Sequence, residues 1–94
     1  MQPDKPTQGD LRVWWIPQVP MNAFYVPVKT VHEAKLILNT LALYDIFQFE
    51  NHIKPDYSNA GGLEVYDDID GTGKLDWGEW YDEDGNDIDD TEQE

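Results

Sequence analysis

The sequence has no cysteine, a single serine, no long apolar run and few basic residues, and each shortage excludes a class of function. Without cysteine there is no disulfide, no thiolate metal site and no cysteine nucleophile. Ser58 stands outside any motif of a serine nucleophile. No apolar run approaches the roughly 20 residues that span a bilayer, and the first ten residues lack the apolar core of a signal peptide. We therefore predict a cytoplasmic protein that is not an enzyme and holds no cofactor.

Negative charge is what the sequence has in excess. The 94 residues carry a formal net charge of −14, and the charge is segregated. Residues 1–63 hold six acidic and five basic side chains, whereas residues 64–94 hold fourteen acidic side chains and Lys74 as the one base. Such a field repels nucleic acids and anionic membranes and attracts basic protein surfaces. We therefore expect no direct nucleic-acid binding and no membrane span, and a protein with a basic surface as the partner. The sequence does not indicate an oligomeric state.

The sequence predicts one helix from residue 30 to residue 44. Thr30 and, three residues later, Glu33 form the pattern of a capping box. Apolar residues then recur at helical spacing, and we expect the core face to be formed by Ile37, Leu38 and Leu41. After Tyr44 the chain either continues as helix after a break or starts a short second helix with Asp45 as its N-cap.

Four segments favour β-strands around this helix. They are β-branched, aromatic or alternating in pattern, and they span residues 11–16, 23–29, 62–66 and 74–82. Pro27 marks the second segment as an edge strand, and Gly78 indicates a bulge in the fourth. Residues 87–90 could add one short pairing. The order β-β-α-β-β predicts a small α+β domain, an antiparallel sheet of about four strands packed on one main helix.

We expect a single domain over residues 11–88. Residues 1–10 are polar and contain two prolines and a glycine, so they are expected to form a disordered leader. Residues 89–94 are expected to form an acidic tail.

A possible calcium site lies in the acidic third. Residues 68–79 place oxygen ligands and a glycine at the spacing of an EF-hand loop. The candidate ligands are Asp68, Asp70, Thr72, Lys74 (through its carbonyl), Asp76 and Glu79. However, the segment before the loop is glycine-rich and strand-like, whereas an EF-hand needs a helix on each side. The alternative is an acidic hairpin loop in which Asp-Gly and Thr-Gly provide turn residues.

Tryptophans are the candidate anchors for a partner. Trp14 and Trp15 are adjacent on a strand, so one should enter the core and the other should lie on the opposite face. A second aromatic group sits among the acids, and we predict a partner-binding surface there, formed by Trp77, Glu79, Trp80, Tyr81, Asp82 and Asp84. The alternative is that all four tryptophans serve the core.

Three segments, WWIPQVPM (14–21), FQFENHIKPDYSNAGGLEV (47–65) and WYDEDG (80–85), resemble a family of small bacteriophage and prophage proteins of superinfection immunity. The resemblance covers about residues 12–88. It implies a phage-encoded accessory protein that acts by binding in the cytoplasm of the infected bacterium, through superinfection exclusion or inhibition of a host function. Residues 68–76 fall where such proteins are expected to vary in length, which argues against an essential metal loop.

Three hypotheses therefore remain open. The first is this phage protein that binds a host or phage protein and blocks a competing infection. The second is an acidic mimic of nucleic acid that inhibits a host defence or DNA-processing enzyme. The third is a calcium-binding module built on residues 68–79.

Overall fold

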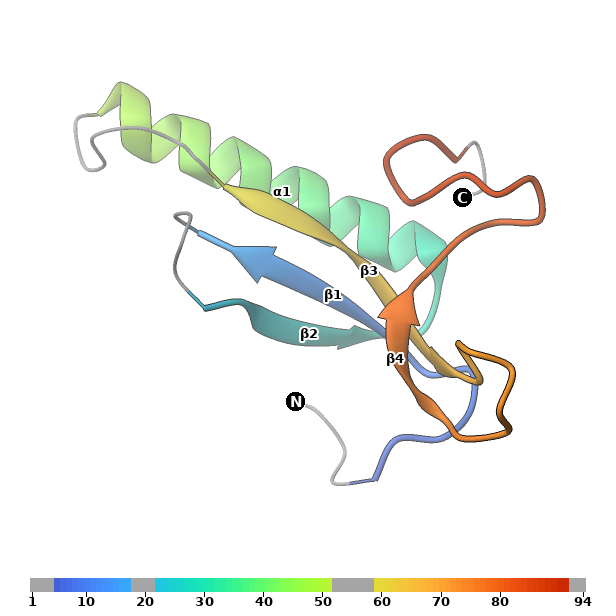
Figure 1. The fold of residues 1–94 in the computed structure, drawn as a ribbon. Helices are drawn as coiled ribbons and strands as arrows, with labels where there is room; N and C mark the ends of the chain where they lie inside the picture. Colours follow the sequence, from blue (N-terminus) through green and yellow to red (C-terminus); the bar gives the residue numbers. More distant parts are fainter. Residues whose placement is uncertain (1–4, 18–21, 52–58, 92–94) are drawn as a thin grey trace.

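The computed structural model describes residues 5–17, 22–51 and 59–91, and these form one helix and one antiparallel sheet (Figure 1). The elements are β1 (Leu11–Ile16), β2 (Phe24–Val28), α1 (Val31–Glu50), β3 (Ala60–Asp67) and β4 (Asp76–Glu79). The predicted α+β class and the predicted order of elements are confirmed.

Strand order in the sheet is β2-β1-β3-β4, so the first strand of the chain is central and the second is an edge. The position of Pro27 on edge strand β2 is confirmed; proline lacks an N–H and is tolerated where one side of a strand has no neighbour. On β1, Trp15 is buried, at 5% exposure, and Trp14 lies on the opposite face. The expected division of the two tryptophans is therefore also confirmed.

Helix α1 begins as predicted but ends later. The Thr30 hydroxyl accepts a hydrogen bond from the Glu33 amide (3.1 Å), and the Glu33 carboxylate accepts one from the Lys29 amide (2.6 Å). The helix then runs unbroken to Glu50. The expected break near residue 44 is wrong, and so is the role of Asp45 as an N-cap. No glycine or proline interrupts the chain at this point, so the helix simply continues.

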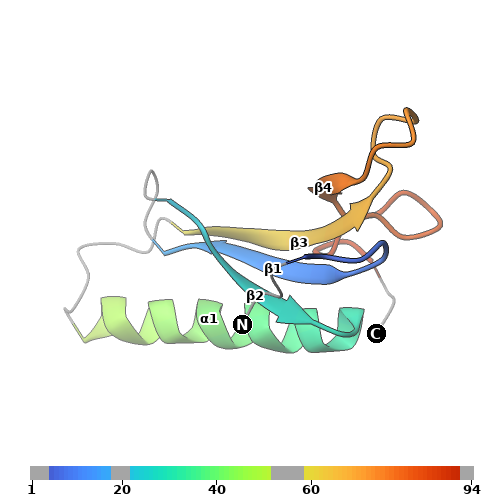
Figure 2. The same cartoon turned by 90° about the horizontal axis from the view of Figure 1, so that it is seen from below.

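The core lies between α1 and one face of the sheet (Figure 2). Ile37 and Leu38 pack against it from the helix, as predicted, whereas Leu41 is only half-buried and lies outside the core cluster. The fully packed cluster consists of Val13, Val28, Val31, Ala34, Leu63 and Ile88. The helix is thus held mainly through its first two turns, and no helix within the described residues covers the opposite face of the sheet.

Strand β4 is shorter and more regular than expected. It pairs with β3 from Asp67 opposite Asp76 to Glu64 opposite Glu79, with one residue facing one residue throughout. The predicted bulge at Gly78 is therefore wrong. Any residue other than glycine at this position would have to displace the Ile69 side chain, because an added Cβ would lie 2.7 Å from it.

Hydrogen-bonded structure extends beyond residues 11–88 at both ends. Gly9 donates to the Tyr66 carbonyl (2.8 Å), and Tyr66 donates to the Asp10 carbonyl (2.9 Å), so the last residues of the expected leader are fixed to β3. Residues 88–90 form a turn rather than a strand pairing, and Thr91 is buried. Residues 1–4 and 92–94, the remainder of the expected leader and tail, lie outside the described residues.

Candidate functional site

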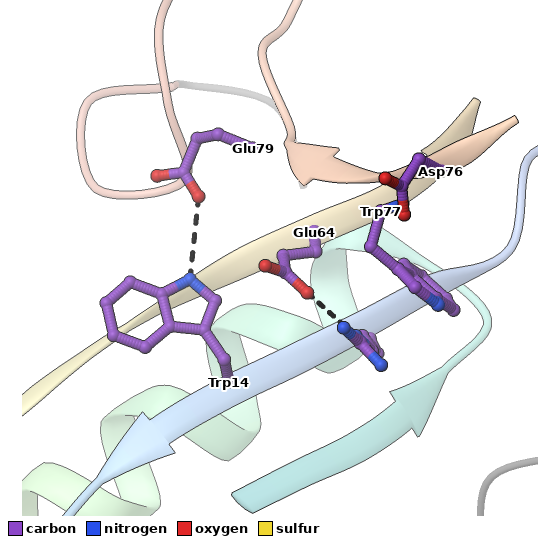
Figure 3. A network of polar contacts seen from close by, with 6 residues as sticks. Trp14, Glu64, Asp76, Trp77 and Glu79 are labelled. Carbon is purple, nitrogen blue, oxygen red and sulfur yellow. Dashed lines mark hydrogen bonds and ion pairs between the residues drawn. The ribbon is translucent and has the colours of Figure 1, made fainter. Parts of the chain in front are cut away.

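The sheet face that points away from α1 is rich in aromatic and charged side chains. Alternate residues of a strand share a face, and the register brings the alternate residues of all four strands together. We define the open face by Arg12, Trp14, Tyr25, Glu64, Tyr66, Trp77 and Glu79. Figure 3 shows part of this group, with Trp14, Glu64 and Trp77 projecting from neighbouring strands.

Arg12 is at the centre of the open face. Its guanidinium lies 3.9 Å from the centroid of the Tyr25 ring and 4.1 Å from that of the Trp77 ring. Its Nε donates a hydrogen bond to the Glu64 carboxylate at 2.7 Å, and the two side chains are only 16% and 23% exposed. Cation–π contacts and a charge-assisted hydrogen bond are both strengthened by partial burial. Arg12 therefore ties β1, β2, β3 and β4 together through side chains.

One aromatic pair and one ring placed over a glycine extend this array. The Tyr66 and Trp77 rings are 5.3 Å apart at an angle of 57°, within the range of a favourable tilted contact. Trp14 lies over the backbone of Gly62, where an added Cβ would be 2.6 Å from the indole nitrogen. Glycine at this position is what allows the indole to lie flat on β3.

The indole N–H of Trp14 donates to the Glu79 carboxylate at 3.5 Å (Figure 3). Partial burial raises the pKa of Glu79 above its ordinary value, and the negative charges of Asp87, Glu64 and Asp89 add to the rise. A carboxylate with these neighbours gains from a cationic group brought to it. The open face can thus offer aromatic surfaces for stacking together with an acceptor that favours a positive charge.

The loop of the calcium hypothesis has a different frame from that of an EF-hand. The loop is entered from β3 and left through β4, so it lacks the flanking helices of an EF-hand. Asp70 accepts hydrogen bonds from the amide and hydroxyl of Thr72, which lower the pKa of this carboxyl group, and Asp68 accepts one from the Gly73 amide. Glu79 points to Trp14 on the open face.

The other two candidate ligands, Lys74 and Asp76, line one pocket together with Asp70. The Asp76 carboxylate accepts from the Trp77 amide, and Lys74 is exposed. Among the residues that the structure describes, no three histidine or acidic side chains gather into a group that could hold a metal ion. Calcium binding stays a prediction.

The predicted partner-binding residues divide between two regions. Trp77 and Glu79 belong to the open face, whereas Trp80 packs against the core cluster, and Tyr81 and Asp84 are exposed beyond β4. Asp82 holds the following turn: its carboxylate accepts from the Thr91 hydroxyl (2.6 Å) and from the amides of Asp84 and Asn86. These hydrogen bonds, that of the Thr91 hydroxyl first, lower the pKa of Asp82.

Five members of the open face were absent from the predicted site: Arg12, Trp14, Tyr25, Glu64 and Tyr66. A signal existed in the alternation of LRVWWI and GLEVY, which separates two faces on each strand. The identity of the facing residues depends on strand register, and no local pattern fixes it.

No helix in the described residues is long and apolar enough to cross a bilayer.

Among known proteins, the chain is similar to a protein named superinfection exclusion protein of Salmonella phage P22, with 55% identity over 58 residues. That match covers 62% of this chain and 56% of the relative, so the chain spans little more than half of the relative's length. No solved structure matches. The family described as superinfection exclusion gene product 17 matches residues 10–94, nearly the whole sequence, and the chain therefore belongs to that family.

Proposed function

We propose that this chain acts in superinfection exclusion by binding a host or phage protein, without catalysing a reaction. The observation that carries the proposal is the open face, where aromatic rings are fixed around Arg12 and rimmed by Glu64 and Glu79. Tryptophan, tyrosine and arginine are the residue types most enriched at binding hot spots. Rings already held in place by neighbouring strands lose little conformational entropy on binding. Family membership supports the biological role.

The partner in this proposal has a basic surface. Residues 64–94 carry a net charge of −13, and they include β4 and the turns beside the open face. Charges at the rim of an interface chiefly raise the association rate, whereas a desolvated anchor provides affinity. Trp77 is the proposed anchor, because it lies on the open face while Trp80 is engaged with the core. The proposed place of action is the cytoplasm of the infected bacterium, which cell fractionation tests.

The test measures plating of a challenging phage on cells that express the protein. Trp77→Ala and Trp14→Ala should each reduce exclusion, because each removes an aromatic ring from the open face. Ile46→Ala is the matched control, since Ile46 is 41% exposed on α1, on the other side of the sheet. Circular dichroism and melting curves confirm that each variant is folded. Full exclusion by both tryptophan variants, with a loss in Ile46→Ala, would move the functional surface to the helix.

A pull-down from host lysate tests the charge complementarity separately. Recovery of the partner should fall steeply between low and high salt, because exposed charges are screened. Trp77→Ala should lower recovery at both salt concentrations. Recovery that is independent of salt would contradict a basic partner surface.

An acidic mimic of nucleic acid is the second candidate. It is favoured by the position of the hairpin loop and the C-terminal turns, which lie at the β4 end of the molecule and hold eight of the sixteen acidic side chains of the described residues (Figure 1). The mimic predicts that the partner is a nucleic-acid-binding enzyme and that DNA competes with this chain for it. Unchanged binding in the presence of excess DNA would rule out the mimic and leave the first proposal intact.

A further inference from the structure

The outer surface of α1 is apolar where most surface helices are charged. Leu36, Leu43 and Phe47 are 61%, 68% and 57% exposed, and Tyr44 beside them is 58% exposed. Leu36, Thr40, Leu43 and Phe47 are spaced by four, three and four residues and therefore form one line along the helix. We call this line, with Tyr44 at its side, the outer stripe. The sheet lies on the other side of α1 (Figure 2).

The line of the outer stripe from Leu36 to Phe47 contains one polar side chain, that of Thr40, and the exposed Tyr44 hydroxyl lies at its side. Thr40 donates its hydroxyl to the Leu36 carbonyl at 2.8 Å, so this residue satisfies its own hydrogen bond within the helix. Between Lys35 and Glu50 the helix has one charged residue, Asp45, which is 3% exposed and accepts a hydrogen bond from the Asn59 side chain (2.6 Å). A surface with these properties can be covered without leaving a buried donor or charge unpaired.

The area of the stripe matches what a small dimer needs. With about 200 Å² for a whole large side chain, the four exposed apolar residues present about 500 Å² on one copy. Two copies would bury about 1,000 Å², the lower bound of a specific interface. For a single small protein, 500 Å² is near the largest apolar patch that monomers usually expose.

Charge favours a second copy in one particular orientation. The acidic C-terminal turns pack at the start of α1, where Lys35 Nζ donates to the Thr91 carbonyl at 2.8 Å (Figure 1). The outer stripe extends away from that end. In an antiparallel pair the two acidic ends lie at opposite ends of the dimer, so the repulsion between two chains of −14 each is smallest. An anionic membrane surface would be repelled by the same charge.

We propose that this chain forms a two-fold symmetric homodimer through the outer stripe, with the two α1 helices antiparallel. The symmetry axis passes between Thr40 and Leu43, so that Leu36 of one protomer packs on Phe47 of its partner and Thr40 packs on Leu43. The same register places Glu33 opposite Glu50 of the partner at each end of the contact, and the repulsion within these two pairs adds to the salt dependence of the dimer. The two open sheet faces point outward in this arrangement, so the dimer has two binding surfaces.

Sedimentation of the full chain over a range of micromolar concentrations tests the proposal. The mass should rise from 10.9 kDa toward twice that value. Salt should strengthen the dimer, because it screens the repulsion between the copies; binding of the basic partner should be weakened by the same salt. Failure of the dimer and failure of the proposed function can therefore be told apart.

Leu43→Asp should raise the dimer dissociation constant by about 100-fold or more, because two unpaired charges would enter the contact. Tyr81→Asp is the matched control: Tyr81 is 59% exposed, lies outside the stripe and receives the same charge. Both variants should keep the melting temperature of the monomer. Dimers that persist in Leu43→Asp would overturn the proposal, and so would a wild type that stays monomeric or binds phosphatidylglycerol vesicles through the stripe.

Cross-linking tests the antiparallel orientation of the two α1 helices. The sequence has no native cysteine, so only the introduced thiols can react. A mixture of Leu36→Cys and Phe47→Cys chains should be joined by a short bismaleimide. Each variant alone should not be joined, since two copies of Leu36 are separated by about 16 Å along antiparallel helices. Efficient joining of Leu36→Cys to itself would refute the antiparallel arrangement.

Discussion

Alanine at Gly61 and alanine at Gly62 should have unequal effects, although the two residues are adjacent. In the sheet register Gly61 is opposite Trp15 and Gly62 is opposite Trp14, on the two faces of β3. An added Cβ would lie 2.4 Å from Trp15 Cε3 at the first position and 2.6 Å from Trp14 Nε1 at the second. Both distances are too short, so one ring or the other must move.

The loss in the free energy of unfolding depends on whether the indole ring can move without displacing other buried side chains. Trp15 is 5% exposed between the sheet and α1, and Leu38 is 3.0 Å from the same added Cβ, so overpacking there should cost about 1–3 kcal/mol. Trp14 is on the open face and can swing toward solvent. The gain of about 0.4–1 kcal/mol from replacing a glycine in the unfolded chain should offset most of the cost at Gly62.

Urea and thermal unfolding, followed by tryptophan fluorescence, measure the difference. Gly61→Ala should lower the melting temperature by roughly 5–15 °C, since 1 kcal/mol corresponds to about 4–8 °C in a domain of this size. Gly62→Ala should melt within a few degrees of the wild type but should lose partner binding, because the displaced Trp14 leaves Glu79. Equal losses of stability, or a larger loss for Gly62→Ala, would refute the assignment of the two faces.

Three further predictions concern charged groups. Arg12→Met should destabilise the fold by about 1–3 kcal/mol in urea unfolding, because Glu64 is left partly buried without its partner; no change would mean that the pair is not formed in solution. The hydrogen bond from the Thr91 hydroxyl lowers the pKa of Asp82 in the folded protein below the pKa of 3.8 in the unfolded chain. The ionised carboxylate therefore stabilises the fold at pH values above 3.8, and this stabilisation is lost as the pH falls through the lower pKa of the folded protein. The melting temperature of Asp82→Asn should therefore lie below that of the wild type at pH 7, and the gap should narrow below pH 3.8. Millimolar Ca²⁺ should cause a small, non-saturating rise in melting temperature, because it screens the negative charges. Mg²⁺ should cause the same rise in the wild type, and Ca²⁺ should cause it in the Glu79→Gln variant. A stoichiometric Ca²⁺ binding isotherm that is lost in Glu79→Gln would contradict this.

Local physical chemistry was enough to predict the elements. A capping residue, helical spacing of apolar side chains and the absence of glycine and proline mark the start of α1 at Thr30, and its interior requires no distant contact. The alternation in LRVWWI places Trp14 and Trp15 on opposite faces wherever the strand lies. Charge segregation is a property of the sequence alone, and it already favours a basic partner.

Tertiary structure decided what these elements do together. Asp45 looks like an N-cap in the sequence, yet it is covered inside α1 and accepts a hydrogen bond from Asn59, fourteen residues away. Gly78 looks like a bulge, yet its register is regular and the Ile69 side chain explains the glycine. Both errors have one cause: a polar residue or a glycine has a local role and a packing role, and only the neighbours in space select between them.

The candidate site shows most clearly which properties the sequence predicts and which depend on tertiary structure. Arg12, Tyr25, Glu64 and Trp77 come from four strands, and the ion pair joins residues 52 positions apart. A shift of one residue in the register of any of these strands would move that strand's side chains to the other face. The sequence by itself determined which residues could bind a partner and the sign of the charge around them. Which of them share the open face was set by strand pairing, because a sheet brings distant residues together through hydrogen bonds that no local pattern encodes.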